Sequence, residues 1–158
     1  MRKGIILLMC VLLAVSCTGC GKELSLDESP DDAVLTELDG LELSVKYANR
    51  DAVTYTARNT SGTGFFYEGH IPGWLEKEVD GAWYPLAYRD DLTMTADFIC
   101  AELTDAEKTH TITAASWYTA PLSAGHYRVI MSGCPTEEAL VNGNCDNVMY
   151  LAAEFDIE

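Results

Sequence analysis

Apolar and polar residues alternate with a period of two along much of the chain after residue 40. Apolar residues recur at Leu41, Leu43, Val45 and Tyr47, and again at Val53, Tyr55 and Ala57. Such alternation predicts β-strands with one buried face and one solvated face. Three later stretches, 109–117, 125–133 and 147–158, are also predicted strands. One face of the last stretch holds Met149, Leu151, Ala153, Phe155 and Ile157.

Asp80 and Gly81 separate two further strand-like runs. An Asp-Gly pair in this setting is typical of a type I′ hairpin turn, because both central residues of that turn need a positive φ. The turn predicts three cross-strand pairs, which are Val79 with Ala82, Glu78 with Trp83, and Leu75 with Leu86. We then expect Leu75, Val79 and Leu86 in the core. The Trp83 ring is expected to be a lid or an exposed aromatic.

The predicted strands number about seven, with turn signals between them, and no stretch has the pattern of an amphipathic helix. This predicts an all-β fold, an antiparallel β-sandwich. Gly125 and Tyr127 resemble the tyrosine corner of immunoglobulin-like domains, whose hydroxyl binds the backbone a few residues upstream. Where antibody domains have a Cys after that Tyr, this chain has Val129. The irregular segment 95–103 is expected to be a strand or a short helical turn.

The beginning of the chain has the layout of a secretory signal. Arg2 and Lys3 precede the apolar stretch 4–15, and the small residues 16–20 follow it. This order predicts a signal peptide over residues 1–19. The apolar stretch is shorter than the ~20 residues that a membrane-spanning helix needs.

The end of this segment resembles the lipobox of bacterial lipoproteins, in which a Cys receives a diacylglycerol and becomes the first residue after cleavage. Thr18 and Gly19 before Cys20 resemble the usual junction, so Cys20 is the predicted lipidation site and Cys17 is the alternative. A redox Cys-x-x-Cys would need a βαβ pattern around it, and a zinc site would need two further ligands nearby. Neither is present. The resemblance implies a membrane partner, reached through the lipid.

Asp and Glu outnumber Lys and Arg by 25 to 10, which gives a net charge of −15. Phosphate backbones repel a chain this acidic, so nucleic acid is excluded as a partner. The stretch 20–39 has low hydrophobicity and high like charge, which predicts a disordered tether that follows the lipidated Cys. The predicted organisation is a signal peptide over 1–19, this tether over 20–39, and an immunoglobulin-like domain over 40–158.

Three strings resemble those of a known family. They are "LEKEVDGAWYPL", "SWYTAPLSAGHYRV" and the closing "YLAAEFDIE". Together they resemble the bacterial immunoglobulin-like domain found in small lipoproteins, mostly of Gram-positive bacteria, over roughly residues 50–158. The resemblance implies the fold and an extracytoplasmic, membrane-anchored location. It implies no activity and no catalytic residues. The insert "CPTEEALVNGNC" departs from the family pattern, because it lengthens the last loop.

Three cysteines remain in the predicted domain. Cys134 and Cys145 are expected to form a disulfide, which can persist outside the cell and closes a small loop. Cys100 is then left over, and its pairing with Cys134 or Cys145 stays open as an alternative. A metal site is the weaker interpretation, because His70, His110 and His126 are too far apart in sequence to form a ligand pair. We therefore expect no metal.

The sequence contains neither a G-x-S-x-G elbow nor an H-E-x-x-H motif, and no catalytic residue or cofactor is predicted. The glycine-flanked loop 62–74 is rich in aromatics, and Phe65, Phe66 and Trp74 are a candidate binding patch. We expect a non-enzymatic binding module that takes a protein or another envelope ligand. The alternatives are a structural spacer or accessory subunit of a membrane partner and, less favoured, an envelope hydrolase.

Overall fold

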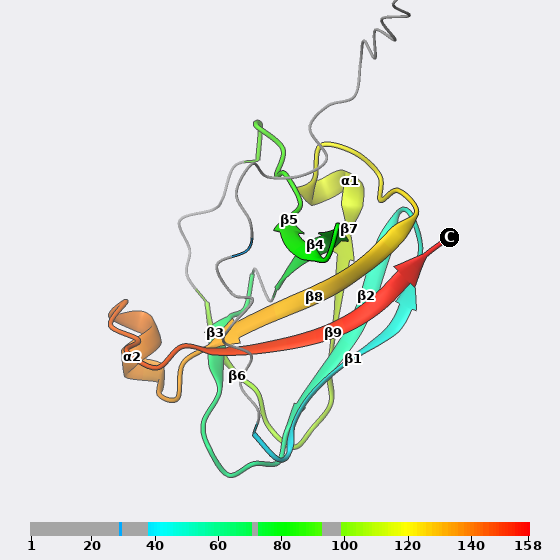
Figure 1. The fold of residues 1–158 in the computed structure, drawn as a ribbon. Coiled ribbons are helices and arrows are strands. Elements are labelled where there is room, and N and C mark those ends of the chain that lie inside the picture. Colours follow the sequence, from blue (N-terminus) through cyan, green and yellow to red (C-terminus); the bar gives the residue numbers. More distant parts are fainter. Residues whose placement is uncertain (1–28, 30–37, 71–72, 93–98) are drawn as a thin grey trace, which may run out of the picture.

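A computed structural model describes residues 29, 38–70, 73–92 and 99–158 of the chain (Figure 1). Nine strands lie in this part. They are β1 (Leu41–Ala48), β2 (Ala52–Asn59), β3 (Phe66–Glu68), β4 (Trp74–Val79), β5 (Ala82–Pro85), β6 (Cys100–Glu102), β7 (Lys108–Thr113), β8 (Gly125–Gly133) and β9 (Met149–Ile157). Two short helices join them, α1 (Ala114–Trp117) and α2 (Glu137–Val141). Every strand pairing is antiparallel.

The strands form two main sheets and one small one. The first main sheet has the order β1-β2-β7 and the second has the order β5-β4-β8-β9, while β3 and β6 form a separate two-stranded sheet. The two main sheets face each other across an apolar core, and β1 lies next to β9 along one side (Figure 1). The predicted all-β sandwich is confirmed.

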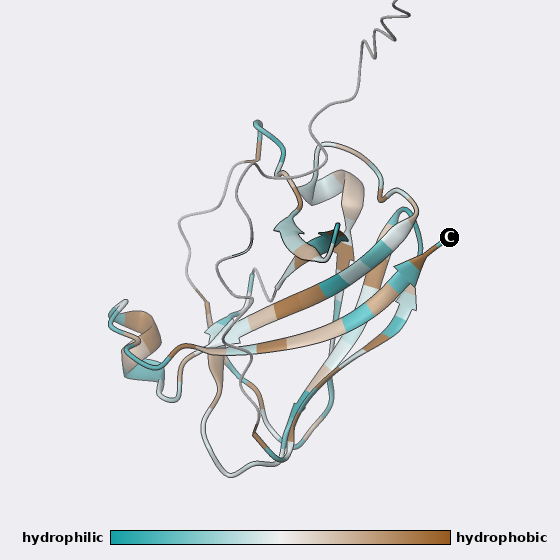
Figure 2. Ribbon diagram, in the orientation of Figure 1, coloured by the Kyte–Doolittle hydropathy of each residue, from teal (hydrophilic) through white to brown (hydrophobic). Residues whose placement is uncertain are grey.

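The core follows the predicted alternation. Its main cluster includes Val53, Tyr55, Leu75, Leu86, Ile112, Tyr127, Val129, Phe155 and Ile157. A second cluster lies where β8 ends and β9 begins, and it includes Ala57, Phe65, Tyr67, Leu103, Met131, Met149 and Leu151. Figure 2 shows the alternation as hydrophobic and hydrophilic bands along β9. Because side chains of a strand point to opposite faces in turn, one face of β9 supplies both clusters.

The β4–β5 hairpin has the predicted register. Val79 pairs with Ala82 and Glu78 pairs with Trp83, and the Leu86 amide donates to the Leu75 carbonyl at 3.0 Å. Asp80 and Gly81 have φ values of 54° and 84°, as a type I′ turn requires. Leu75 and Leu86 are buried, whereas Val79 and Trp83 are half-buried.

The predicted burial of Tyr47 is wrong. The register of β1 against β2 shifts between Val45 and Tyr47, and such a bulge turns the following side chains to the opposite face. The Tyr47 side chain is therefore 57% exposed, and Ala48 packs against the core in its place.

The predicted strand 109–117 ends early. Thr113 pairs with Ala52, the first residue of β2, so the chain beyond Thr113 has no neighbouring strand. It turns instead into α1, whose first residue, Ala114, donates its amide to the Asp51 carbonyl at 2.7 Å. Of the ambiguous segment 95–103, residues 100–102 form β6, and residues 93–98 lie outside the described part.

Candidate binding site

Gly125 and Tyr127 form the predicted tyrosine corner. The Tyr127 hydroxyl donates to the Ser123 carbonyl at 2.8 Å, and the ring is fully buried against Phe155, with centroids 5.7 Å apart. Gly125 has a φ of 151°, a conformation that residues with a Cβ rarely adopt. This corner holds the start of β8 and is structural.

The predicted disulfide between Cys134 and Cys145 is present, with their Cα atoms 5.8 Å apart. It closes the segment that leaves β8 and returns to β9, and this segment contains α2. Thr136 caps the helix by accepting the Ala139 amide at 3.2 Å. Figure 1 shows α2 at the end of the sandwich away from the C-terminus. Cys100 is a free, half-buried thiol.

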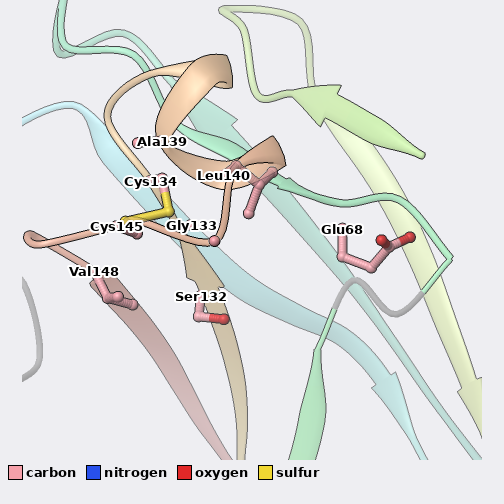
Figure 3. A pocket seen from close by; sticks show the side chains of 9 residues that line it. Glu68, Ser132, Gly133, Cys134, Ala139, Leu140, Cys145 and Val148 are labelled. Atoms are coloured by element: carbon pink, nitrogen blue, oxygen red, sulfur yellow. A yellow bond between two sulfur atoms is a disulfide. The ribbon is translucent and has the colours of Figure 1, made fainter. Parts of the chain in front are cut away.

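A cavity of about 300 Å³ lies between this segment and the small β3–β6 sheet. We name it the α2 groove, and its lining is Glu68, Ser132, Gly133, Cys134, Ala139, Leu140, Gly143, Cys145 and Val148. Figure 3 shows Leu140 reaching from α2 into the space between the disulfide and Glu68. The groove is therefore apolar in its middle, with a carboxylate at one side.

The β3–β6 sheet directs its polar side chains to one face. Glu68 pairs with Cys100 and Phe66 pairs with Glu102, and directly paired residues share a face. Tyr67, on the opposite face, is buried in the second core cluster. Since the core takes that face, Glu68, Cys100 and Glu102 lie on the face that α2 approaches.

The pKa of the Cys100 thiol is affected by the carboxylates on this face. Burial raises the pKa of the Cys100 thiol, and the carboxylates of Glu137, Glu68 and Glu102 raise it further. Three carboxylates from β3, β6 and α2 therefore act on one point beside the groove. Sequence reasoning missed this cluster, because residues 68, 102 and 137 are brought together only by the β3–β6 pairing and the disulfide-closed segment.

Residues 40–147 match the sequence profile of a family described as bacterial Ig-like domain. The chain belongs to this family. The matched region contains the strands β1 to β8, the tyrosine corner and the disulfide, and it ends just before β9. No curated protein and no solved structure matches the chain. The family resemblance predicted from the sequence is thus confirmed at the level of the domain.

The predicted aromatic patch does not form one surface in this Ig-like domain. Phe65 is fully buried in the second core cluster, because the residue before β3 points into the sandwich, and it is no ligand contact. Phe66 is half-buried and exchanges backbone hydrogen bonds of 2.8 Å with Cys134. Trp74 lies at the start of β4, where its indole donates to Glu76 at 2.9 Å and its ring contacts Tyr150.

A buried ion pair is the main feature that sequence reasoning missed. The Arg128 side chain on β8 is 4% exposed and the Glu76 side chain on β4 is fully buried, with a nitrogen–oxygen distance of 2.6 Å. The Arg128 guanidinium also lies 4.4 Å from the centre of the Trp83 ring. Trp83 is thus a lid over this pair. The available signal was the hairpin register, which places Trp83 on the same face as Glu76 and Glu78.

Ser29 completes this cluster from outside the two sheets. Its hydroxyl donates to Glu76 at 2.7 Å and its amide donates to the Trp83 carbonyl at 2.8 Å, and the residue is 6% exposed. At this residue the predicted tether contacts the domain. Residues 20–28 and 30–37 lie outside the described part, so the rest of the tether stays a prediction.

His126 lies beside Trp83 near the start of β8, and its side chain is 34% exposed. Its ring contacts Asp156 at 2.8 Å and Glu154 at 3.3 Å. The hydrogen bond to Asp156, followed by that to Glu154, raises the pKa of His126. In the described part of the chain, no three His, Cys, Asp or Glu residues are placed to hold a metal ion.

The predicted signal peptide and the candidate lipidation sites Cys20 and Cys17 lie outside the described residues. Within the residues that are described, no helix is long and apolar enough to cross a membrane. The anchor therefore stays a prediction from the sequence.

Proposed function

We propose that this chain is a lipoprotein anchored to the outer side of the cell membrane, and that its Ig-like domain is a non-enzymatic binding module. The α2 groove carries the proposal, because it is a concave, mostly apolar site at one end of a well-packed sandwich. Loops at the ends of β-sandwiches are the usual place for recognition.

Two further observations support this role. The disulfide between Cys134 and Cys145 is of a kind that persists in oxidising compartments. The signal-like segment before Cys20 provides the route to such a compartment. The ligand is a protein or another component of the envelope, and the membrane is reached through the lipid.

Labelling with a palmitate analogue tests the anchor. The unchanged chain and Cys17→Ala are expected to carry label in the membrane fraction, and Cys20→Ala is expected to lose it. Loss of label in Cys17→Ala alone would move the lipid to Cys17. Label in neither variant, with none in the unchanged chain, would refute the anchor.

Photo-crosslinking on intact cells tests the binding role. A photo-reactive residue replaces Val141, which lies on α2 and is 56% exposed, or Tyr47, which lies on β1 and is 57% exposed. We expect a distinct crosslinked partner from position 141 and none from position 47. A single stoichiometric partner captured from position 47 alone would favour the accessory-subunit role instead.

A further inference from the structure

The α2 groove lies in a region of one charge sign. The sequence has no Lys or Arg from residue 59 to residue 76, and none from residue 129 to the end. These are the segments that supply the whole lining of the groove. A ligand that enters it meets no Lys or Arg from either segment.

The carboxylates at the rim are not neutralised by the protein itself. Within the described residues, Glu68, Glu102 and Glu137 have no cationic partner, although six other acidic residues of the domain are in ion pairs of 4 Å or less with Lys, Arg or His. Glu68 is held in position because its carboxylate accepts the His70 amide at 2.9 Å. Glu68 in the lining, together with Glu102 and Glu137 beside the groove, therefore offers carboxylates without a partner of opposite charge.

The middle of the groove is suited to bind an apolar group. Leu140 and Val148 are half-buried, and with the disulfide they form its apolar surface. The carboxylates come from three different elements and do not converge into a metal-binding cluster. An occupant must therefore carry an apolar side chain and spaced positive charges together.

We propose that the α2 groove binds a peptide segment of a partner protein in which an apolar side chain is flanked by Lys or Arg. The apolar side chain packs against Leu140, Val148 and the disulfide, and the basic side chains face Glu68, Glu102 and Glu137. This inference rests on the proposed binding function and adds the site and the class of ligand. A second copy of this chain does not fit, because its net charge of −15 makes the copies repel each other.

The test measures fluorescence anisotropy of labelled synthetic peptides with the full-length chain in mild detergent. The probe is a short peptide of alternating Lys and Leu. One control peptide has Glu in place of Lys, and the other has Ser in place of Leu. We expect binding of the Lys/Leu peptide only, and weaker binding as NaCl rises from about 50 to 300 mM, because salt screens exposed charges.

Two matched pairs of variants locate the site. Glu68→Gln with Glu102→Gln is expected to weaken binding about tenfold, since exposed charge pairs contribute modestly each. Asp51→Asn with Glu158→Gln removes the same net charge at exposed positions outside the groove lining and is expected to change binding less than twofold. Leu140→Ser is expected to weaken binding about tenfold, and Val141→Ser, on the exposed side of α2, is its control.

Equal losses in the two charge pairs would show attraction by net charge alone and overturn the inference. Equal losses in Leu140→Ser and Val141→Ser, or no binding of the Lys/Leu peptide, would overturn it as well. Circular dichroism of each variant confirms that it is folded before binding is measured. A partner crosslinked in cells from position 141 without any binding of the peptide would refute this ligand class and leave the proposed function standing.

Discussion

The buried pair of Glu76 and Arg128 makes a strong prediction about stability. Removal of one partner leaves the other charge buried without compensation, which costs about 3–5 kcal/mol. Both side chains are almost fully buried, so solvent screening does not reduce this figure. We therefore expect Glu76→Leu or Arg128→Met to lower the free energy of unfolding by about 3–5 kcal/mol.

The double variant distinguishes charge from packing. In Glu76→Leu with Arg128→Met no charge is left in the site, and buried pairs replaced by apolar residues are often neutral in stability. This variant still loses the contact of Arg128 with the Trp83 ring, which contributes about 1–2 kcal/mol when desolvated. It also removes the acceptor of the Ser29 hydroxyl and of the Trp74 indole, at a cost of about 1 kcal/mol each. We expect a total loss of about 3–4 kcal/mol, well below the sum of the two single losses.

Urea unfolding at neutral pH, followed by tryptophan fluorescence, measures these free energies. The control is Arg58→Met with Glu42→Leu, because that pair on β1 and β2 is exposed and is expected to contribute less than about 1 kcal/mol. A double variant of Glu76 and Arg128 whose loss equals the sum of the two single losses would refute the reasoning, since independent sites are additive.

Three further predictions follow from the described contacts. Replacement of Cys134 and Cys145 by Ala is expected to lower the free energy of unfolding by about 2–3 kcal/mol in urea, because the small closed loop gains entropy when unfolded; an unchanged midpoint would contradict this. Since its partners Asp156 and Glu154 raise the pKa of His126, its stabilisation is complete below about pH 6.5 and is lost as pH rises through the folded pKa. Unfolding free energies at several pH values should therefore fall more steeply toward pH 8 in the unchanged chain than in His126→Gln, and parallel profiles would refute it. Tyr127→Phe should cost about 1 kcal/mol in thermal or urea unfolding, whereas Tyr55→Phe should cost nothing, because in the described part of the chain the buried Tyr55 hydroxyl has no hydrogen-bond partner.

Features set by neighbouring residues were predictable from the sequence. The alternation in β2 and β9 identified their buried residues, and Asp80-Gly81 identified the turn and its register. The disulfide was also predictable, because Cys134 and Cys145 are only eleven positions apart. In each case a short stretch of chain contains the whole physical cause.

The candidate site was much less predictable. Of the proposed aromatic patch, Phe65 is in the core and only Phe66 lies on the β3–β6 face beside α2. Strands of three residues, such as β3 and β6, are too short to show a clear period. The capping signal of Thr136, followed by two glutamates, was the available sign of α2.

Local pattern was enough to predict most of the long strands, the hairpin, the tyrosine corner and the family of this protein, because neighbouring residues alone set each of these features. The pairing of distant segments was needed to show that Tyr47 turns outward at a bulge, that Glu76 meets Arg128 from 52 positions away, and that Glu68 faces Leu140 across a groove. The physical reason is that strand pairing between distant segments sets which side chains are buried together. The charged rim of the α2 groove is a product of that pairing.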